Sequence, residues 1–336
     1  MTASLQNSAS PSRLHRATAK DWLLSHGGVA SIAIFFAAVC LLFAAGTASF
    51  MSAANILNIL RQSAPLLIVA AAMTFVITTA GIDLSVGSVL ALVGALSAFL
   101  LQWGLPWPLV VLAMLLAGAA VGAFHGYFVA YEGVPAFIVT LAGLSIIRGV
   151  ALLITGGYSI PVDPESGFGD IGRAWVVGLP LPAVIASGVL ALAYLVFNQT
   201  RFGRHVTGIG ANAEAVRRAG VDVRRATLIV YMLSSTAAAL AGIVLTARLG
   251  SGSSNAGLGF ELDVIAAVVL GGTSLFGGRG TIIGTVLGAL TVAVIANGLI
   301  LSHMSPFLSP IVTGFIILVA IWLNFRLFRR ATRSRQ

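Results

Sequence analysis

Ten long apolar runs follow one another along this chain and limit what it can fold into. Most are close to 20 residues long, the length at which an α-helix crosses a lipid bilayer. The eighth is too short for a full straight crossing, so one span is expected to be short or discontinuous. The sequence therefore predicts an all-α integral membrane protein with about ten transmembrane helices. The runs are approximately 27–46, 63–80, 84–101, 107–130, 136–155, 181–198, 228–249, 262–273, 281–302 and 307–324.

Composition excludes a soluble domain. Apolar residues make up 58% of the chain and charged residues 9%, with a mean hydropathy of +1.01. A soluble protein of this length needs more charge on its surface. The first run, 27–46, is longer than the ~7–15 apolar residues of a cleaved signal peptide, so it is interpreted as a spanning helix. A single cysteine, Cys40, excludes a disulfide framework within the chain.

Basic residues indicate the orientation. With ten spans and the N-terminus inside, the inner face receives the tail 1–26, the loop 199–227, the turn 277–280 and the C-terminal segment 326–336. The tail holds three, the loop six, the turn one and the C-terminal segment five of the nineteen Lys and Arg residues. This excess predicts cytoplasmic termini around a transmembrane domain at 27–325. It also explains the net charge of +9 without a nucleic-acid partner.

The basic loop contains a candidate contact for a soluble protein. Its stretch Ala211–Ala219 predicts a short helix that stops at Gly220, a residue suited to a helix C-terminus. One interpretation is a solvated surface helix. The other is a lever that enters a groove on a cytoplasmic partner and carries force. The candidate coupling residues are Glu214, Ala215, Arg217, Arg218 and Gly220.

No catalytic or metal chemistry is expected in this chain. Its only lysine, Lys20, has no glycine-rich loop before it, so the chain cannot form a phosphate-binding P-loop. If ATP hydrolysis drives the protein, ATP and Mg²⁺ must bind to another polypeptide. His125 and His303 are interpreted as buried polar groups, and no residue spacing predicts a metal site.

Two turns at the predicted inner face are candidate gates. Gly81, Asp83 and Ser85 open the third span, where Asp83 or Ser85 is expected to cap the helix, with gate closure as an added role. Gly277 and Gly278 lie in a glycine-rich turn after the short span. Close backbone packing explains that turn better than phosphate binding.

Arg148 lies inside a predicted span. It either reaches to the interface or pairs with an acid, for which Glu261 and Asp263 are the nearest plausible partners.

A solute path is predicted from polar groups within the spans. The candidates are Phe137, Thr140, Ser145 and Asn297, of which the last three offer hydroxyl or amide groups. Few ionisable groups lie within the spans, so a small neutral solute is favoured over a charged one.

Four segments together resemble a known family. They are Gly81–Leu92, Pro135–Gly149, Phe202–Val223 and Glu261–Thr285, and the last is highly specific. The chain resembles the ribose/xylose/galactoside-type permeases of bacterial ABC importers. The resemblance implies a dimeric inner-membrane subunit that works with a periplasmic sugar-binding protein and two ATPase domains. Glu214–Gly220 would be its coupling helix.

The sequence departs from this family at two positions, and other functions stay open. His125 stands where asparagine is common, and Ala142 replaces a usual glycine. The leading hypothesis is alternating access for a neutral sugar, driven by a partner ATPase. The alternatives are a branched-chain amino-acid permease, an ion-coupled transporter and a membrane scaffold. The 156–180 loop is either a connector or a docking surface for the extracytoplasmic partner.

Overall fold

The computed structural model describes residues 19–304 and the isolated positions 308, 311, 314, 315, 318 and 319, with side chains from residue 29 onward. Most of the predicted tenth span, 307–324, lies outside the described residues. So do most of the predicted tail 1–26 and all of the predicted tail 326–336. The first helix begins within that N-terminal tail, at Ala19.

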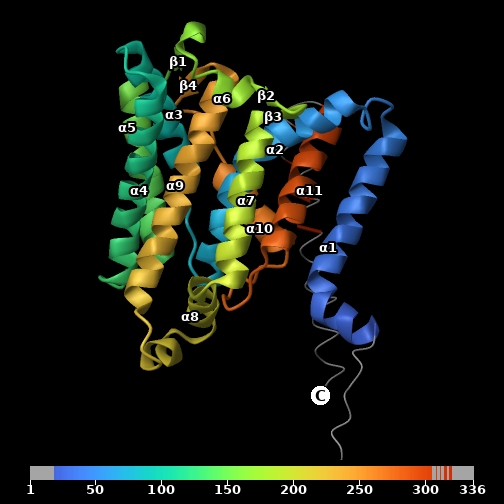
Figure 1. Ribbon diagram of the computed structural model, residues 1–336, viewed down its shortest axis with the longest axis vertical. Helices are drawn as coiled ribbons and strands as arrows, with labels where there is room; N and C mark the ends of the chain where they lie inside the picture. Colours follow the sequence, from blue (N-terminus) through green and yellow to red (C-terminus); the bar gives the residue numbers. More distant parts are fainter. Residues whose placement is uncertain (1–18, 305–307, 309–310, 312–313, 316–317, 320–336) are drawn as a thin grey trace, which may run out of the picture.

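Long helices running roughly parallel to one another make up most of the molecule (Figure 1). In chain order they are α1 (Ala19–Gly46), α2 (Ala53–Thr78), α3 (Val86–Gln102), α4 (Trp107–Ala130), α5 (Ala136–Thr155), α7 (Leu181–Gln199), α9 (Val223–Leu249) and α11 (Ile282–Leu301). Two further helices are the kinked α8 (Arg201–Arg218), which lies across one end of the bundle, and the short α10 (Phe260–Leu270).

Short elements gather at one end of the bundle, here called the strand end, while α8 lies at the opposite end, the α8 end (Figure 1). Two antiparallel pairs form there, β1 with β4 and β2 with β3. The short elements are β1 (Ser159–Pro161), η1 (Pro164–Ser166), α6 (Asp170–Arg173), β2 (Trp175–Val176), β3 (Leu179–Pro180) and β4 (Ser251–Ser253).

The lengths of the helices confirm a multi-pass membrane protein. Among the described residues, seven helices are long and apolar enough to span a membrane, and α3 is a shorter apolar helix of 17 residues. The predicted short eighth run forms a short helix, α10. At a rise of 1.5 Å per residue, the 11 residues of α10 extend about 16 Å, roughly half of the hydrocarbon core.

Most predicted span boundaries agree with the structure, and α4 and α5 have the predicted limits. The largest difference is α2, which begins at Ala53 rather than at residue 63. The Ser52 hydroxyl accepts a hydrogen bond from the Asn55 amide at 3.3 Å and caps this early start. Similarly, α9 begins at Val223 because the Asp222 carboxylate accepts from the Arg225 amide at 3.0 Å.

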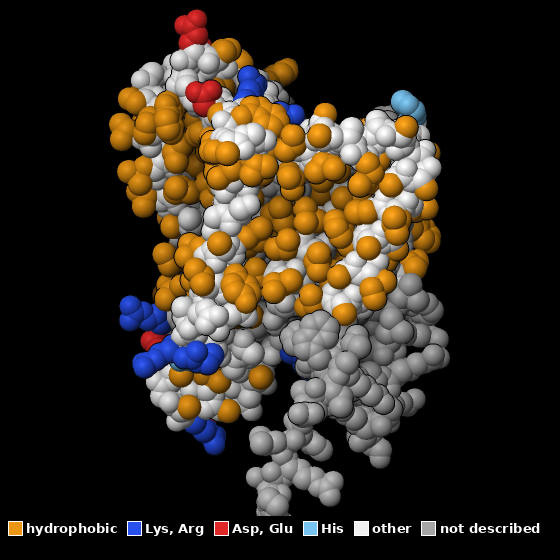
Figure 2. Space-filling view, turned by 45° about the vertical axis from the view of Figure 1, so that its right-hand side comes forward, with side chains coloured by type: hydrophobic (Ala, Val, Ile, Leu, Met, Phe, Trp, Pro, Cys, Tyr) orange, Lys and Arg blue, Asp and Glu red, His pale blue; other side chains and the backbone are white. Residues whose placement is uncertain are grey.

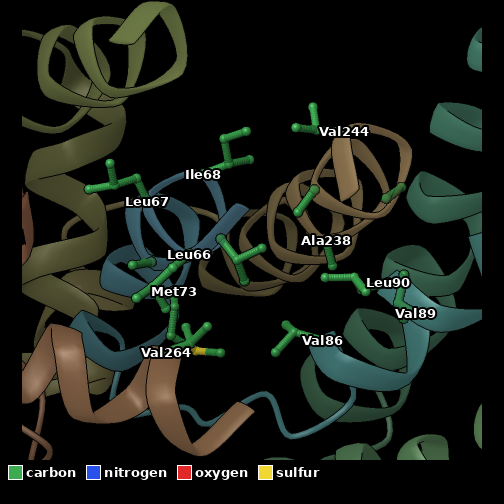
Figure 3. Close-up of a cluster of buried hydrophobic side chains, with 14 of the residues drawn as sticks. Leu66, Leu67, Ile68, Met73, Val86, Val89, Leu90, Ala238, Val244 and Val264 are labelled. Atoms are coloured by element: carbon green, nitrogen blue, oxygen red, sulfur yellow. The ribbon is translucent and has the colours of Figure 1, made fainter. Parts of the chain in front are cut away.

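The core lies where α2, α3, α9 and α10 meet. Figure 3 shows its apolar side chains converging from these helices, among them Met73, Leu90, Val244 and Val264, all buried. Against this core α4 packs closely on α9. A Cβ atom at Gly122 of α4 would lie 2.6 Å from the Met232 Cα atom, so the two backbones approach without a side chain between them.

Candidate functional site

The predicted short helix is the distal part of α8. The backbone of Asn212 is not helical (φ −164°, ψ 95°), so α8 is kinked there. The Asn212 side-chain oxygen accepts a hydrogen bond from the Ala215 amide at 3.0 Å and caps a second helical stretch, 213–218. This stretch is called the distal segment below.

The predicted end of this helix at Gly220 is confirmed. Gly220 has a φ of +87°, and its amide donates to the Arg217 carbonyl at 3.0 Å. The Val221 amide donates to the Val216 carbonyl at 3.3 Å. This pair of bonds closes a helix that ends on a left-handed residue, which explains why a glycine stands there.

The charged side chains of the distal segment pair with one another. Glu214 Oε2 lies 2.6 Å from Arg217 Nη2, and Glu214 Oε1 lies 2.9 Å from Arg218 Nε. All three side chains are exposed. Such exposed pairs stabilise a helix by only about 0.2–0.5 kcal/mol each, so both arginines remain able to exchange Glu214 for another partner. Figure 2 shows that arginine side chains gather at the α8 end, below a broad apolar surface.

The proximal half of α8 is packed tightly into the bundle through glycines. A Cβ atom at Gly210 would lie 2.5 Å from the Gly278 nitrogen and 2.9 Å from the Thr78 carbonyl carbon. The Gly278 amide donates to the Thr78 carbonyl at 2.9 Å. A Cβ atom at Gly277 would lie 2.8 Å from the Gly210 oxygen and 3.0 Å from the Ala80 nitrogen. We call these five residues the glycine junction.

The glycine junction joins two predicted features that lie far apart in sequence, the basic loop 199–227 and the 277–278 turn. Gly277 and Gly278 both have positive φ values, +79° and +74°, which favour glycine. Since backbone contacts backbone here, a displacement of α8 must also displace this turn or the end of α2.

Behind the junction, Asp83 is completely buried. One carboxylate oxygen, Oδ1, accepts from the Ser85 amide at 3.0 Å and from the Ser85 hydroxyl at 2.6 Å. The other, Oδ2, accepts from the Ser234 hydroxyl of α9 at 2.7 Å. Asp83 therefore binds Ser85, the residue just ahead of α3, and fastens the α2–α3 connection to α9. The expected side-chain cap of α3 is absent, because neither Asp83 nor Ser85 accepts from an amide within the first turn of this helix.

His125 of α4 extends this polar cluster. It is 1% exposed, and its Nδ1 atom lies 3.3 Å from the Ser85 hydroxyl oxygen. Because that hydroxyl donates its only proton to Asp83, His125 is the donor in this contact. The Thr140 hydroxyl of α5 donates to the Ala136 carbonyl of its own helix at 2.9 Å and also lies 3.3 Å from the Ile82 carbonyl. We call Asp83, Ser85, His125, Thr140 and Ser234 the Asp83 cluster; it connects the start of α3 with α4, α5 and α9.

Sequence reasoning missed Ser234 and the link to His125. The signal that was present is the acid itself, because a carboxylate among apolar runs needs hydrogen-bond donors from neighbouring helices. Gly81, the remaining residue of the predicted turn, packs beneath Tyr231, whose hydroxyl oxygen would lie 2.6 Å from a Cβ atom at position 81.

The structure corrects the predicted pairing of Arg148. Its guanidinium donates from Nη1 to the carbonyls of Ser254 at 2.5 Å and Ala256 at 2.8 Å, and from Nη2 to Gly257 at 3.3 Å. The chain between β4 and α10 is not helical at these residues and offers free carbonyls. A planar guanidinium with five donors can bind several of them at once.

The two acids predicted to pair with Arg148 are not in ion-pair contact with it, although Glu261 lies near enough for its charge to act on the guanidinium. Neither Glu261 nor Asp263 forms an ion pair among the residues that the structure describes. Glu261 Oε2 is buried and packs against α3, where a Cβ atom at Gly87 would overlap it. Asp263 is exposed at the surface of α10.

The four predicted path residues do not form one site. Asn297 exchanges two hydrogen bonds of 3.0 Å with Asn55 at the strand end of α2. Thr140 contacts the connection beyond the opposite end of α2. Phe137 and Ser145 are exposed on α5, where the Ser145 hydroxyl donates to a carbonyl of its own helix at 3.3 Å. Asn297 therefore holds α11 to α2.

Comparison with known proteins identifies the family. Residues 55–321 match the family described as branched-chain amino acid transport system / permease component. The chain belongs to this permease family. The ribose import permease protein RbsC of Haemophilus influenzae is 43% identical over 275 residues, covering 81% of this chain and 85% of the relative.

Two relatives from Escherichia coli K12 support the same assignment. Its ribose import permease protein RbsC is 40% identical over 308 residues, covering 91% of this chain and 95% of the relative. Its xylose transport system permease protein XylH is 35% identical, covering 84% and 88%. The predicted resemblance to ribose/xylose-type permeases is therefore confirmed. No solved structure matches the chain.

Proposed function

We propose that this chain is the membrane-spanning permease subunit of an ABC importer and moves a small neutral sugar, a monosaccharide, by alternating access. The observation that carries this proposal is the 40–43% identity to ribose import permeases over most of the chain. The residues support it, since the spans contain few ionisable groups and a charged substrate would find little compensation there.

The distal segment of α8 is the contact for a separate ATPase subunit, which binds ATP and Mg²⁺. Support comes from its exposure: Glu214, Ala215, Arg217, Arg218 and Gly220 are all exposed, and the first of these pairs only with the arginines. An amphipathic helix on a kinked arm suits insertion into a groove of a soluble protein.

Movement passes from the ATPase through the glycine junction to the α2–α3 connection. The junction supports this route because α8, the 277–278 turn and the end of α2 are in backbone contact. The Asp83 cluster lies next along the chain and ties that connection to three further helices. Two arrangements of this unit would open the path to one side or the other.

The strand end receives the periplasmic sugar-binding protein. Aromatic and apolar side chains exposed there support this role, among them Tyr158, Trp175 and Val177, the last 97% exposed. A second permease chain, of the same sequence in a homodimer, completes the path. The complex lies in the bacterial inner membrane with both termini cytoplasmic, as the excess of arginine at the α8 end favours.

Reconstitution tests the proposal. The chain is purified with the ATPase that co-purifies from its own membranes, and proteoliposomes are assayed for uptake of radiolabelled ribose, xylose and leucine with the cognate binding proteins. We expect ATP-dependent uptake of a pentose and none by the chain alone. Uptake of leucine instead would favour an amino-acid permease, and accumulation without the ATPase would contradict an ABC importer.

A further inference from the structure

An apolar groove of about 450 Å³ opens between α7 and α9, with α2 as its floor. Its lining includes Ala193 of α7, Ile229 and Leu240 of α9, and Phe75 of α2. Thr236 is the one residue of its lining with a polar side chain, and that hydroxyl donates to a carbonyl of its own helix at 2.7 Å. The groove therefore offers a ligand no polar partner along its length.

The groove has the depth of one leaflet. On α9 it extends from Ile229 to Leu240, which at 1.5 Å per residue is about 16 Å. The hydrocarbon core of a bilayer is about 30 Å thick, so the groove covers roughly half of it. It ends at Phe202, in the first turn of α8, and therefore lies in the leaflet at the α8 end.

Exposed arginines flank this end of the groove. Arg225 precedes Ile229 by four residues, which places both on the same face of α9. Arg201 directly precedes Phe202. In contrast, Arg224 lies over the Tyr131 ring, 5.9 Å from its centre, and is directed toward the end of α4. The apolar groove thus leads to a local positive charge at the membrane surface.

We propose that this groove binds one acyl chain of an anionic phospholipid, whose phosphate lies beside Arg201 and Arg225. The apolar lining fits a hydrocarbon chain, and the charge at one end fits a phosphate headgroup. Basic sites between transmembrane helices bind such headgroups, and each Lys or Arg near the surface contributes about 1 kcal/mol. This proposal does not depend on the transported solute.

The bound lipid would contact the joint between α7 and α8. The Phe202 ring lies 6.2 Å from Phe75 in a stacked arrangement, and Phe75 meets Phe197 edge to face at 5.1 Å. Since Phe75 and Phe202 both line the groove, an acyl chain there packs on the aromatic cluster from which α8 departs. A lipid bound in the groove therefore stabilises the start of α8, the helix that carries the distal segment.

Native mass spectrometry of the purified full-length chain tests the groove. Delipidated protein is titrated with phosphatidylglycerol and with phosphatidylcholine of the same acyl chains. We expect one phosphatidylglycerol per chain to bind in preference to phosphatidylcholine. Ala193→Phe fills the groove and should abolish this binding, whereas the control Ala191→Phe, on the exposed face of α7 outside the groove, should retain it.

The charge is tested with a second matched pair. Arg225→Gln should reduce the preference for phosphatidylglycerol about fivefold, the equivalent of one arginine at the surface. Arg224→Gln, which removes the same charge beside Tyr131, should leave it unchanged. Equal binding of the two lipids, or unchanged binding to Ala193→Phe, would overturn the proposal. Loss of dimer in Ala193→Phe alone would also overturn it, since a second copy would then occupy the groove.

Discussion

Asp83 illustrates how single residues hold this bundle together. A carboxylate without solvent is costly unless donors surround it, and its two oxygens accept three hydrogen bonds from Ser85 and Ser234. The donors come from the start of α3 and from α9, 151 positions away in sequence. One side chain thus fixes the α2–α3 connection against the core.

Replacing Asp83 should therefore destabilise the fold. Asp83→Ala leaves these donors unpaired, and each buried unpaired group costs about 1–3 kcal/mol, so the free energy of unfolding should fall by about 3 kcal/mol or more. Equilibrium unfolding in mixed micelles with increasing dodecyl sulfate measures it. Asp163→Ala is the control, because the Asp163 carboxylate accepts one exposed hydrogen bond, from the Glu165 amide. An equal loss in both variants would contradict this account.

Arg148 gives the second prediction at this scale. Its partners are backbone carbonyls, which accept hydrogen bonds from a guanidinium. A glutamate at position 148 has no proton to donate to them, and no side-chain substitution elsewhere changes these carbonyls. Exchanging the charges, with Arg148→Glu and Glu261→Arg in one chain, should therefore leave sugar uptake as low as in Arg148→Glu alone. Uptake in proteoliposomes and the amount of folded protein are measured together. Recovery in the double variant would indicate that an ion pair between these residues is the essential contact.

Among the elements, α8 combines an exposed end with a tightly packed base. A Cβ atom at Gly210 would overlap the Thr78 carbonyl oxygen, and adding one methyl group to such a contact costs about 1–3 kcal/mol. That is enough to change the balance between two conformations about tenfold.

In the assembled importer, Gly210→Ala should therefore lower sugar uptake about tenfold while ATP hydrolysis continues. Gly188→Ala on α7, where no atom lies within 4 Å of the added Cβ, is the matched control and should transport normally. The ratio of ATP hydrolysed to sugar transported is the measurement. A parallel loss of both activities would instead indicate a defect in folding or assembly.

The elements also show what one sequence can predict. Hydropathy gave the limits of α4 and α5, which begin directly after Pro106 and Pro135. It misplaced the start of α2 by ten residues, because Asn55, Asn58 and Arg61 lower the hydropathy of its first turns without preventing a helix. The bonds that cap and end a helix join residues close together in sequence. The distal segment and its end at Gly220 were therefore predictable.

Contacts between distant segments were not predictable from one sequence. The glycine junction joins backbone atoms, and glycine alone does not specify which segment it approaches. The Arg148 partners are carbonyls, which every residue carries, so no residue pattern distinguishes them from other backbone. Glu261 and Asp263 were predicted as partners because a sequence identifies acidic side chains but not free backbone carbonyls.

Over the whole molecule, basic residues are concentrated at one end. The α8 end carries Arg201, Arg204, Arg217, Arg218 and further arginines, whereas the strand end combines the acids Asp163, Glu165 and Asp170 with Arg173 and Arg248. Insertion places basic segments in the cytoplasm, so the excess of arginine at the α8 end also orients the proposed importer. The ATPase contact and the binding-protein surface then lie on the sides where those partners reside.

Thiol labelling tests this orientation in intact cells. Cys40 is the only cysteine, so Cys40→Ser gives a background without reactive thiols. Glu165→Cys, in the exposed turn of η1 at the strand end, should react with a membrane-impermeant maleimide. Ala213→Cys, in the exposed distal segment, should react only after the membrane is permeabilised. Because both sites are exposed, access across the membrane alone decides their labelling. Labelling of position 213 in intact cells would place the distal segment outside, where no ATPase can reach it, and the proposed coupling would fail.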